Sequence, residues 1–553
     1  MSTPFDLKRL RGEFPILSTR INGQPLVYLD NAATTQKPRL VIDAISQYYK
    51  RYNANVHRAA HTLSGQATEA FEQIRHTLAA FIGAPHAREI IWTRGTTESL
   101  NLVAYSFLEP RLQTGDRVLL MDVNHHANIV PWQQTCLRRG AHIDVLNAAN
   151  GEIDWQQYRE LLARKPVLVA LTQVSNATGA RYPIHQLCRE AKSAGAVVVV
   201  DGAQAVPHDE LDLSKLACDF YAFSGHKLFG PTGIGALWGR QSLLSEMTPW
   251  QTGGEMIESV SFETTRFAGL PFKFEAGTPD IAGVIGLGAA IDFLTGKNRQ
   301  ALAAHETALR QQAMERCQSI KGWRAVAAGD NPASLISFVI DGHHPQDIGL
   351  WLDQQGIAVR AGHHCAMPLM SRLGLNGTVR ASLAFYNTAQ EVERFAQALE
   401  TLVNTGTTAP VSLELTSQNI ALIRAVEQAS DWHQRYGALM KLGSMTPRLP
   451  ATLQQDKFRV HGCESKVWLI MKLDSEGRLD CHADADARIL RALLALLLHW
   501  CNGLMPQEVL LLDLRARIAE LDLSRHLSPS RGNGVIALIE ALEQFAQTCA
   551  EDC

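Results

Sequence analysis

The stretch from Val197 to Gly235 limits what this chain can fold into more than any other part of the sequence. It begins with four consecutive valines, which are typical of a buried strand, and that strand ends on Asp201. A second short apolar run, Phe220–Phe223, is followed directly by Ser-Gly-His-Lys, with the lysine at position 227. Because open α/β sheets bind ligands at the carboxyl ends of their strands, we expect Asp201 and Lys227 to lie together at that edge.

The surrounding sequence alternates between apolar strands and helical patterns. A helix is predicted at residues 64–81, where Phe71 and Leu78 share one face and Gly83 follows the end. Further strands are predicted at residues 26–29, 90–93, 117–121, 141–146 and 167–172. This alternation predicts an α/β fold in which a mostly parallel, doubly wound sheet is covered by helices on both faces.

The pattern changes after about Phe293. A helix at 300–321 precedes apolar runs at 335–340 and 356–360, which predict a smaller α+β subdomain to which the N-terminal part could also contribute. At 553 residues the chain is too long for one ordinary core, and the small polar stretch before Pro410 is typical of a linker. The predicted segments are a first domain at 1–403, a linker at 404–412 and a second domain at 413–553.

Bulk composition argues against several classes of function. The chain is 46% hydrophobic and 19% charged, and its net charge of -3 gives no electrostatic reason to expect nucleic acid or an anionic membrane as partner. The longest apolar run, Ala492–His499, is far shorter than the roughly 18 residues of a membrane span, and the first residues lack the apolar core of a signal peptide. Ten cysteines without paired spacing argue against a disulfide framework. We expect a cytoplasmic protein.

The predicted carboxylate and lysine suggest a cofactor. An acid that keeps a pyridine nitrogen protonated, together with a lysine that forms an imine, is the set of groups that holds pyridoxal phosphate. A lone lysine after a strand is usually an ordinary surface residue, but here Asp201, Gln204 and the Ser-Gly-His-Lys segment agree. A Walker phosphate loop does not fit, because Lys227 precedes the glycines of the following turn.

From about Tyr28 to Val403 the chain resembles the group II cysteine desulfurases of the SufS/CsdA type, which are pyridoxal-phosphate enzymes of fold type I. The motifs that carry this resemblance follow in the expected order: Leu29–Ala33, Val56–Arg58, Arg94–Glu98, His125–Asn128, Asp201–Gln204, Ser224–Lys227, Glu275–Pro279, Arg360–Ala366 and Arg380–Ser382. The resemblance implies an enzyme that converts L-cysteine to L-alanine with pyridoxal phosphate as cofactor, in a homodimer.

The resemblance also implies a role for each of a set of polar residues. Lys227 would hold the cofactor covalently and then move protons, Asp201 would pair with the pyridinium nitrogen, and His125 would stack on the ring. The other implied contacts are Gln204 with the ring hydroxylate, Thr96, Ser224 and His226 with the phosphate, Thr278 with the phosphate from a second subunit, Asn176 with hydroxylate and substrate, and Arg380 with the substrate carboxylate.

Cys365 is the candidate nucleophile of the first domain. Sulfur transfer from cysteine needs a thiolate, and the segment Gly-His-His-Cys places imidazoles beside the Cys365 thiol, which favours the thiolate. Two other interpretations stay open. The histidines and Cys365 could bind zinc, with His343 and His344 as further ligands, or Cys365 could be an ordinary buried cysteine.

The second domain resembles the SufE/CsdE family of sulfur acceptors. The matching segments are His461–Trp468, Pro506–Glu508 and Leu527–Gly534. Cys463 would be the acceptor thiol, at the start of a strand that runs through Val467, Leu469 and Met471. Glu464 and Lys466 stand where this family carries neutral polar residues, so the local charge differs from the family pattern. A structural cysteine is the alternative for Cys463. The pair Cys481 and His482 could suggest a metal, but no second pair supports one, and we expect no metal site.

We therefore predict a fusion in which sulfur passes from cysteine to Cys365, then to Cys463, and then to a sulfur-accepting protein for iron–sulfur cluster assembly or another sulfur-requiring pathway. Two further classes stay open. One is a different fold type I enzyme, such as an aminotransferase or a selenocysteine lyase. The other is a scaffold whose C-terminal domain only docks a partner.

Overall fold

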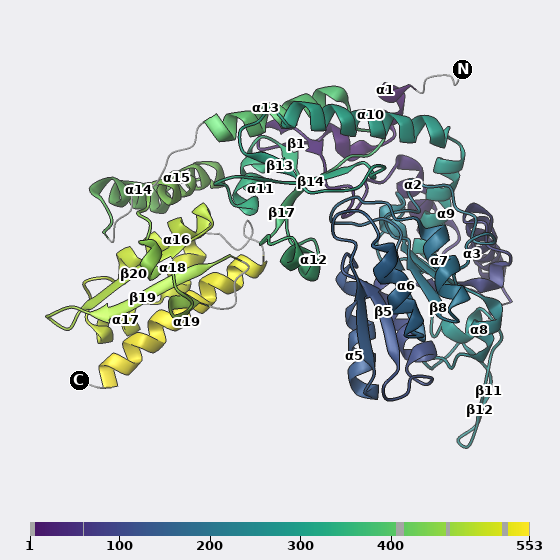
Figure 1. Ribbon diagram of the computed structural model, residues 1–553. Coiled ribbons are helices and arrows are strands. Elements are labelled where there is room, and N and C mark those ends of the chain that lie inside the picture. The colour runs from purple at the N-terminus through teal and green to yellow at the C-terminus, as the bar shows by residue number, and fades with distance from the viewer. Residues whose placement is uncertain (1–5, 59, 405–413, 461–464, 522–528, 552–553) are drawn as a thin grey trace. The chain divides into compact units, whose positions relative to one another are not determined.

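The computed structural model describes residues 6–58, 60–404, 414–460, 465–521 and 529–551. It divides into two compact units (Figure 1). Unit 1 comprises residues 1–319, 324–338 and 356–396, and unit 2 comprises residues 320–323, 339–355 and 397–553. Most of the predicted linker at 404–412 lies outside the described residues, so the boundaries of the two domains stay a prediction.

A seven-stranded sheet forms the centre of unit 1. Its strands, in spatial order, are β4 (Ile90–Thr93), β10 (Gly235–Gly239), β9 (Phe220–Ser224), β8 (Val197–Asp201), β7 (Leu168–Thr172), β5 (Arg117–Met121) and β6 (His142–Leu146). The strands from β9 to β6 run parallel, whereas β10 pairs antiparallel with both of its neighbours. The predicted mostly parallel sheet is therefore confirmed, with one reversed strand inside it.

Successive residues of the central strands enter two separate cores. In β8, Val198 and Val200 belong to one cluster of buried side chains, while Val199 belongs to another. Because neighbouring side chains of a strand point to opposite faces, the two clusters lie on the two faces of the sheet. Each fully buried valine or leucine contributes about 1.5–3 kcal/mol, so helices that cover both faces explain the continuous apolar runs.

The helix predicted at 64–81 is present in unit 1, where it begins two residues earlier and ends as predicted. In α3 (Thr62–Phe81), Phe71 and Leu78 are buried as predicted, and the His61 side chain caps the first turn by accepting a hydrogen bond from the Ser64 N–H. The remaining helices before residue 300 are α1 (Leu7–Gly12), α2 (Arg39–Arg51), α4 (Thr96–Leu102), which continues as a π-helix (Val103–Leu108), α5 (Val130–Arg139), α6 (Trp155–Ala163), α7 (Ile184–Ser193), α8 (Gln241–Glu246) and α9 (Ile281–Thr295).

A four-stranded sheet follows in the order β13 (Trp323–Ala325), β14 (Leu335–Ile340), β17 (Thr378–Ser382) and β16 (Arg360–Gly362). The strand predicted at 356–360 is split in two. Its first part, β15 (Ile357–Ala358), pairs in parallel with β3 (Val27–Tyr28), so the N-terminal segment does contribute, and the chain then passes into β16. The helices of this stretch are α10 (Arg299–Cys317), α11 (Pro345–Gln354), α12 (Met367–Arg372) and α13 (Ala389–Asn404).

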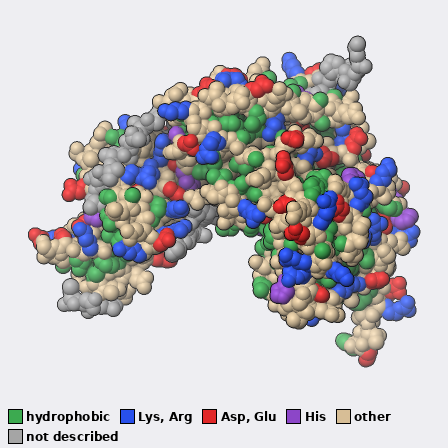
Figure 2. Space-filling view, in the orientation of Figure 1, with side chains coloured by type: hydrophobic (Ala, Val, Ile, Leu, Met, Phe, Trp, Pro, Cys, Tyr) green, Lys and Arg blue, Asp and Glu red, His purple; other side chains and the backbone are tan. Residues whose placement is uncertain are grey.

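The surface of unit 1 carries mixed charge and one narrow projection. Figure 2 shows blue and red side chains interspersed on the face in view, in keeping with the small net charge. The strands β11 (Ile257–Val260) and β12 (Thr265–Phe267) form a hairpin whose residues are mostly exposed, including Phe262. A second small hairpin joins β1 (Arg20–Ile21) to β2 (Gln24–Pro25).

Unit 2 has its own core around a three-stranded antiparallel sheet. The strands are β18 (Arg459–Val460), β19 (Val467–Leu473) and β20 (Leu479–Ala485), and β19 contains the predicted Val467, Leu469 and Met471. Its helices after residue 413 are α14 (Ser417–Gln428), α15 (Trp432–Met445), α16 (Arg488–Cys501), α17 (Pro506–Leu511), α18 (Leu514–Glu520) and α19 (Pro529–Glu551), and α11 also belongs to this unit. None of the helices in the described ranges combines the length and apolarity that crossing a membrane needs.

Candidate active site

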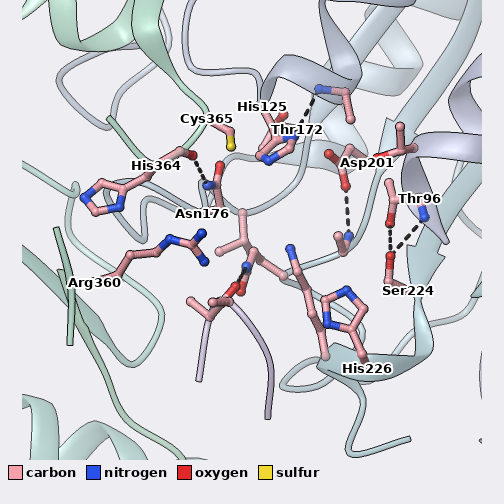
Figure 3. Close-up of a pocket in the computed structure, with 18 of the residues that line it drawn as sticks. Thr96, His125, Thr172, Asn176, Asp201, Ser224, His226, Arg360, His364 and Cys365 are labelled. Atoms are coloured by element: carbon pink, nitrogen blue, oxygen red, sulfur yellow. Dashed lines mark hydrogen bonds between the residues drawn. The ribbon is translucent and has the colours of Figure 1, made fainter. Parts of the chain in front are cut away.

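A cavity of about 200 Å³ opens at the carboxyl edge of the large sheet (Figure 3). Three parallel neighbours each bring the residue at their carboxyl end into its wall: Thr172 from β7, Asp201 from β8 and Ser224 from β9. The cavity thus lies where parallel strands end together, which is the position predicted for Asp201 and Lys227. Both residues line it.

Lys227 follows β9 at the end of a short 3₁₀ turn, Gly225–Lys227. The preceding peptide is held firmly, because the carbonyl oxygen of His226 accepts hydrogen bonds from Thr35 N at 3.1 Å and from Lys37 Nζ at 2.9 Å. Burial lowers the pKa of Lys227 to about 8, although Asp201 opposes this shift. Part of the Lys227 population is therefore an uncharged amine near neutral pH, as imine formation requires.

Asp201 is a buried carboxylate fixed by its own turn. One carboxylate oxygen accepts a hydrogen bond from the Ala203 N–H at 3.0 Å. At Gly202 a Cβ atom would lie 2.1 Å from the ring of Tyr221, so only glycine lets the chain turn here. Burial raises the pKa of Asp201, and that cost is reduced when the carboxylate meets a cation such as a protonated pyridine nitrogen.

The start of α4 forms an anion cradle together with Ser224. Ser224 Oγ accepts a hydrogen bond from the Thr96 N–H at 2.9 Å and lies 2.8 Å from Thr96 Oγ1. Gly95 has a φ of +147°, and a Cβ on Gly235 would lie 2.6 Å from the Gly95 Cα, so both glycines permit the close approach of β4, β10 and the turn. Amide groups at a helix start attract a phosphate.

His125 is held as a neutral ring in the cavity wall. Burial lowers its pKa to about 3, and Lys227 and His126 act in the same direction. His125 Nδ1 accepts a hydrogen bond from the Ala127 N–H at 3.0 Å. The proton of the neutral ring is therefore on Nε2, which can donate to a ligand or to a substrate group.

Two predicted ligands of the cofactor line the cavity but donate to the protein here. Gln204 Nε2 donates to the Ala32 carbonyl oxygen at 2.6 Å, and Asn176 Nδ2 donates to the His364 carbonyl oxygen at 2.7 Å. Asn176 thereby connects the loop that follows β7 to the segment that carries Cys365. His226, predicted to hold the phosphate, also lines the cavity, and burial lowers its pKa to about 4.

Two arginines line the cavity, and the sequence assigned a role to only one. Arg380 is buried and donates to Asp30 Oδ1 at 2.9 Å and to the Asn176 carbonyl oxygen at 2.8 Å, while its Nε has no partner among the described residues. Arg360 was missed as a site residue, and its guanidinium points toward the middle of the cavity in Figure 3. The signal was its position two residues before Gly-His-His-Cys, within the Arg360–Ala366 motif, where the resemblance implied no role for Arg360.

Thr278 does not line this cavity. It is exposed and lies in a separate depression with Glu275, Gly277 and Asp280. Within one chain it therefore takes no part in the site, and its predicted contact with the phosphate of a second subunit stays a prediction.

Cys365 lines the cavity as a half-buried thiol on the loop between β16 and α12 (Figure 3). Of the eight cysteines in the described residues, six are buried, and of the two others, Cys365 and Cys549, Cys365 alone lines the cavity. His364 Nε2 lies 2.8 Å from Thr378 Oγ1, and His363 Nδ1 accepts a hydrogen bond from the Cys365 N–H at 3.0 Å. No group of three or more His, Cys, Asp and Glu side chains suited to a metal ion occurs in the described ranges.

The residues of the cavity fit pyridoxal phosphate. The wall contains a primary amine with a lowered pKa, a buried carboxylate, a neutral imidazole and an anion cradle shaped by glycines. In the same order, these groups would bond covalently to the aldehyde, face the pyridine nitrogen, contact the ring and receive the phosphate. Among the described residues, no cation lies at hydrogen-bond distance from the Asp201 carboxylate.

Comparison with known families decides the assignment of this cavity. Residues 27–395 match the model of the aminotransferase class-V family. The chain belongs to that family. Its cofactor is pyridoxal phosphate.

The relatives of this class-V chain indicate which reaction within the family it catalyses. A probable cysteine desulfurase of Vibrio cholerae is 50% identical over 400 residues, which are 72% of this chain and 99% of the relative. A cysteine desulfurase of Serratia proteamaculans is 47% identical over 398 residues, covering 72% and 98% of the two chains. The crystal structure of the cysteine desulfurase CsdA from Escherichia coli matches with a TM-score of 0.68 at 40% identity, covering 73% of this chain and 99% of that one.

A second family match covers the C-terminal part. Residues 420–546 match the SufE model, an Fe-S metabolism associated domain. Together the comparisons confirm the predicted fold type, the cofactor, the cysteine desulfurase class of enzyme and the presence of a separate SufE domain.

Proposed function

We propose that this class-V enzyme removes sulfur from L-cysteine, stores it as a persulfide on Cys365 and passes it to Cys463 of its own SufE domain. The observation that carries the first step is the presence of Lys227 and Cys365 in the wall of one cavity. A lysine that binds the cofactor and a half-buried thiol beside it are the two groups that this reaction needs from the chain.

The first step follows from the residues of the cavity. Bound pyridoxal phosphate supplies an electron sink for the carbon next to the substrate amine. Asp201 keeps the pyridine nitrogen protonated, and Lys227 takes and returns a proton at Nζ. Arg380 and Arg360 give the cavity two guanidinium groups, either of which suits the substrate carboxylate. The neutral His125 holds its proton on Nε2, where it can donate a hydrogen bond without placing a charge beside Lys227.

The sulfur balance of this step needs no added oxidant or reductant. The Cys365 thiolate attacks the substrate sulfur, an S–S bond forms, and the bond between substrate sulfur and carbon breaks. Its electron pair stays with the carbon, which gains a proton to give alanine. Cysteine and one thiol thus give alanine and one persulfide.

The second step is a thiol exchange, in which the Cys463 thiolate takes the outer sulfur and Cys365 returns to its thiol form. Cys463 lies outside the described residues, so its assignment depends on the sequence motif and on the other cysteines of the domain. Burial raises the pKa of Cys481 to about 12 and that of Cys501 to about 11, which suppresses the thiolate needed for exchange. These values support Cys463 over either residue.

Two further parts of the proposal concern partners. The enzyme would act as a homodimer, in which Thr278 completes the phosphate site of the other subunit. The persulfide on Cys463 would pass to a sulfur-accepting protein, with iron–sulfur cluster assembly as the pathway that the SufE match supports.

Kinetics separate the two steps. In the full-length enzyme without added reductant, Cys463→Ala should lower steady-state alanine formation about tenfold or more, because removal of the Cys365 persulfide then loses the high local concentration of a tethered thiol. The first turnover should keep its wild-type rate, and excess dithiothreitol should restore part of the steady state. Cys549→Ala is the matched control in the same domain. Wild-type steady-state rates in the Cys463 variant would reject this cysteine as acceptor.

A further inference from the structure

The loop that carries Cys365 has a backbone conformation that its sequence does not favour. His364 has a φ of +53° and Cys365 a φ of +55°, and neither is a glycine. Left-handed φ values at such residues cost free energy, so surrounding contacts must impose them. Gly362, with a φ of +121°, permits the turn that begins the loop. Without outside contacts the peptide would relax and carry the thiol away from its place in the cavity wall.

Hydrogen bonds from other elements hold both sides of the Cys365 residue. The main-chain N–H of His126 donates to the Cys365 carbonyl oxygen at 2.7 Å. The His126 ring accepts at Nε2 from the N–H of Met367, the first residue of α12, at 3.1 Å. One residue of the 3₁₀ turn after β5 therefore fastens the chain at Cys365 and again two residues later.

The imidazole of His126 suits this acceptor role. Burial lowers the pKa of His126, and the ring of His363, with its centroid 5.5 Å away, acts in the same direction. The neutral ring keeps a lone pair at Nε2 for the Met367 N–H. His126 is not part of the cavity wall, so it affects the reaction through its neighbours, which are the Cys365 loop and His125, whose pKa it helps to lower. The sequence motif contained His126, but no role was assigned to it.

We propose that His126 is a positioning residue for Cys365, whose main chain and imidazole together clasp the 362–367 loop against the large sheet and keep the thiol inside the cavity. This inference rests on the proposed function of Cys365. His126→Gln is the conservative variant, because the glutamine side-chain oxygen can take the place of Nε2 as hydrogen-bond acceptor. Phenylalanine keeps the ring and removes the acceptor.

Two rates in the full-length holoenzyme test the clasp. In His126→Phe, first-turnover alanine formation should slow about 3- to 10-fold, as expected for one lost hydrogen bond, while iodoacetamide should alkylate Cys365 faster by a similar factor. A displaced thiol slows alanine formation and speeds alkylation, whereas a change in the thiol pKa would move both rates in the same direction. Cofactor content and the spectral change on cysteine binding should stay as in the wild type. His126→Gln should return both rates to within about twofold.

His126→Ala serves as the second acceptor-free variant if the phenylalanine protein does not fold, and His142→Phe, at an exposed histidine on β6, is the matched surface control. Unchanged alkylation of Cys365 in a folded acceptor-free variant would overturn the clasp. Equal slowing in the glutamine variant would also overturn it. Failure of the proposed function is recognisable separately, because alanine would then form without Cys365 at all.

Discussion

Replacement of Lys227 by alanine is expected to lower alanine formation from cysteine by more than about a thousandfold, because no other described residue in the cavity wall offers a primary amine. The variant should retain some pyridoxal phosphate through the Asp201 carboxylate and the anion cradle at Thr96 and Ser224. Borohydride should attach the cofactor permanently to the wild-type chain but not to Lys227→Ala, as mass spectrometry of the denatured proteins would show.

Lys227→Arg is the matched variant, since arginine keeps the positive charge near Asp201 without the nucleophilic amine. It should be as inactive as the alanine variant. Lys215→Ala, at an exposed lysine in the same part of the chain, should behave as wild type. An active Lys227→Arg enzyme, or a wild-type protein that cannot be loaded with pyridoxal phosphate, would contradict the assignment of Lys227.

Replacement of Cys365 by serine should lower alanine formation as much as Lys227→Ala does. Unlike Lys227→Ala, it should leave the reaction of cysteine with the bound cofactor intact. The hydroxyl cannot take sulfur at a useful rate, so alanine release should fall by more than about a thousandfold. Cysteine should still change the visible spectrum of the cofactor, because Lys227, Asp201 and His125 are untouched. Stopped-flow spectra and quantified alanine measure both effects in one preparation.

Cys365→Ala should match the serine variant, which would show that the missing thiol and not a new hydroxyl is responsible. Cys549→Ser, at the other half-buried cysteine in the described residues, is the control. Alanine formation at the wild-type rate in either Cys365 variant would place the sulfur acceptor elsewhere.

The sequence predicted those parts of the site that depend on local pattern. The valine run of β8 and the apolar run of β9 are buried on both faces, and this burial explains why continuous hydrophobic segments identified them. Because parallel strands end at a common edge, Asp201 and Lys227 could be placed together before the fold was known. Gly95 and Gly202 lie within the motifs, Gly235 ends the stretch that begins at Val197, and each permits a close approach of neighbouring atoms.

The parts that the sequence did not predict depend on pairing between distant segments. The run at 356–360 gave no sign that it divides between β3 and β17, because each half pairs with a partner far away in the chain. Arg360 and His126 were missed for the same reason. Arg360 reaches the cavity only after β16 joins β17, and His126 contacts a loop that follows it by more than 200 residues. Local spacing cannot reveal such contacts.

The central claim is that one sulfur atom passes from cysteine to Cys365 and then to Cys463. Brief reaction of the full-length enzyme with sulfur-labelled cysteine, followed by alkylation and peptide mass spectrometry without reductant, tests it most directly. The wild type should carry label on Cys365 and Cys463, and Cys463→Ala should carry it on Cys365 alone. Label on Cys481 or Cys501 with Cys463 empty, or label on Cys463 in a Cys365→Ser enzyme, would contradict the proposed path.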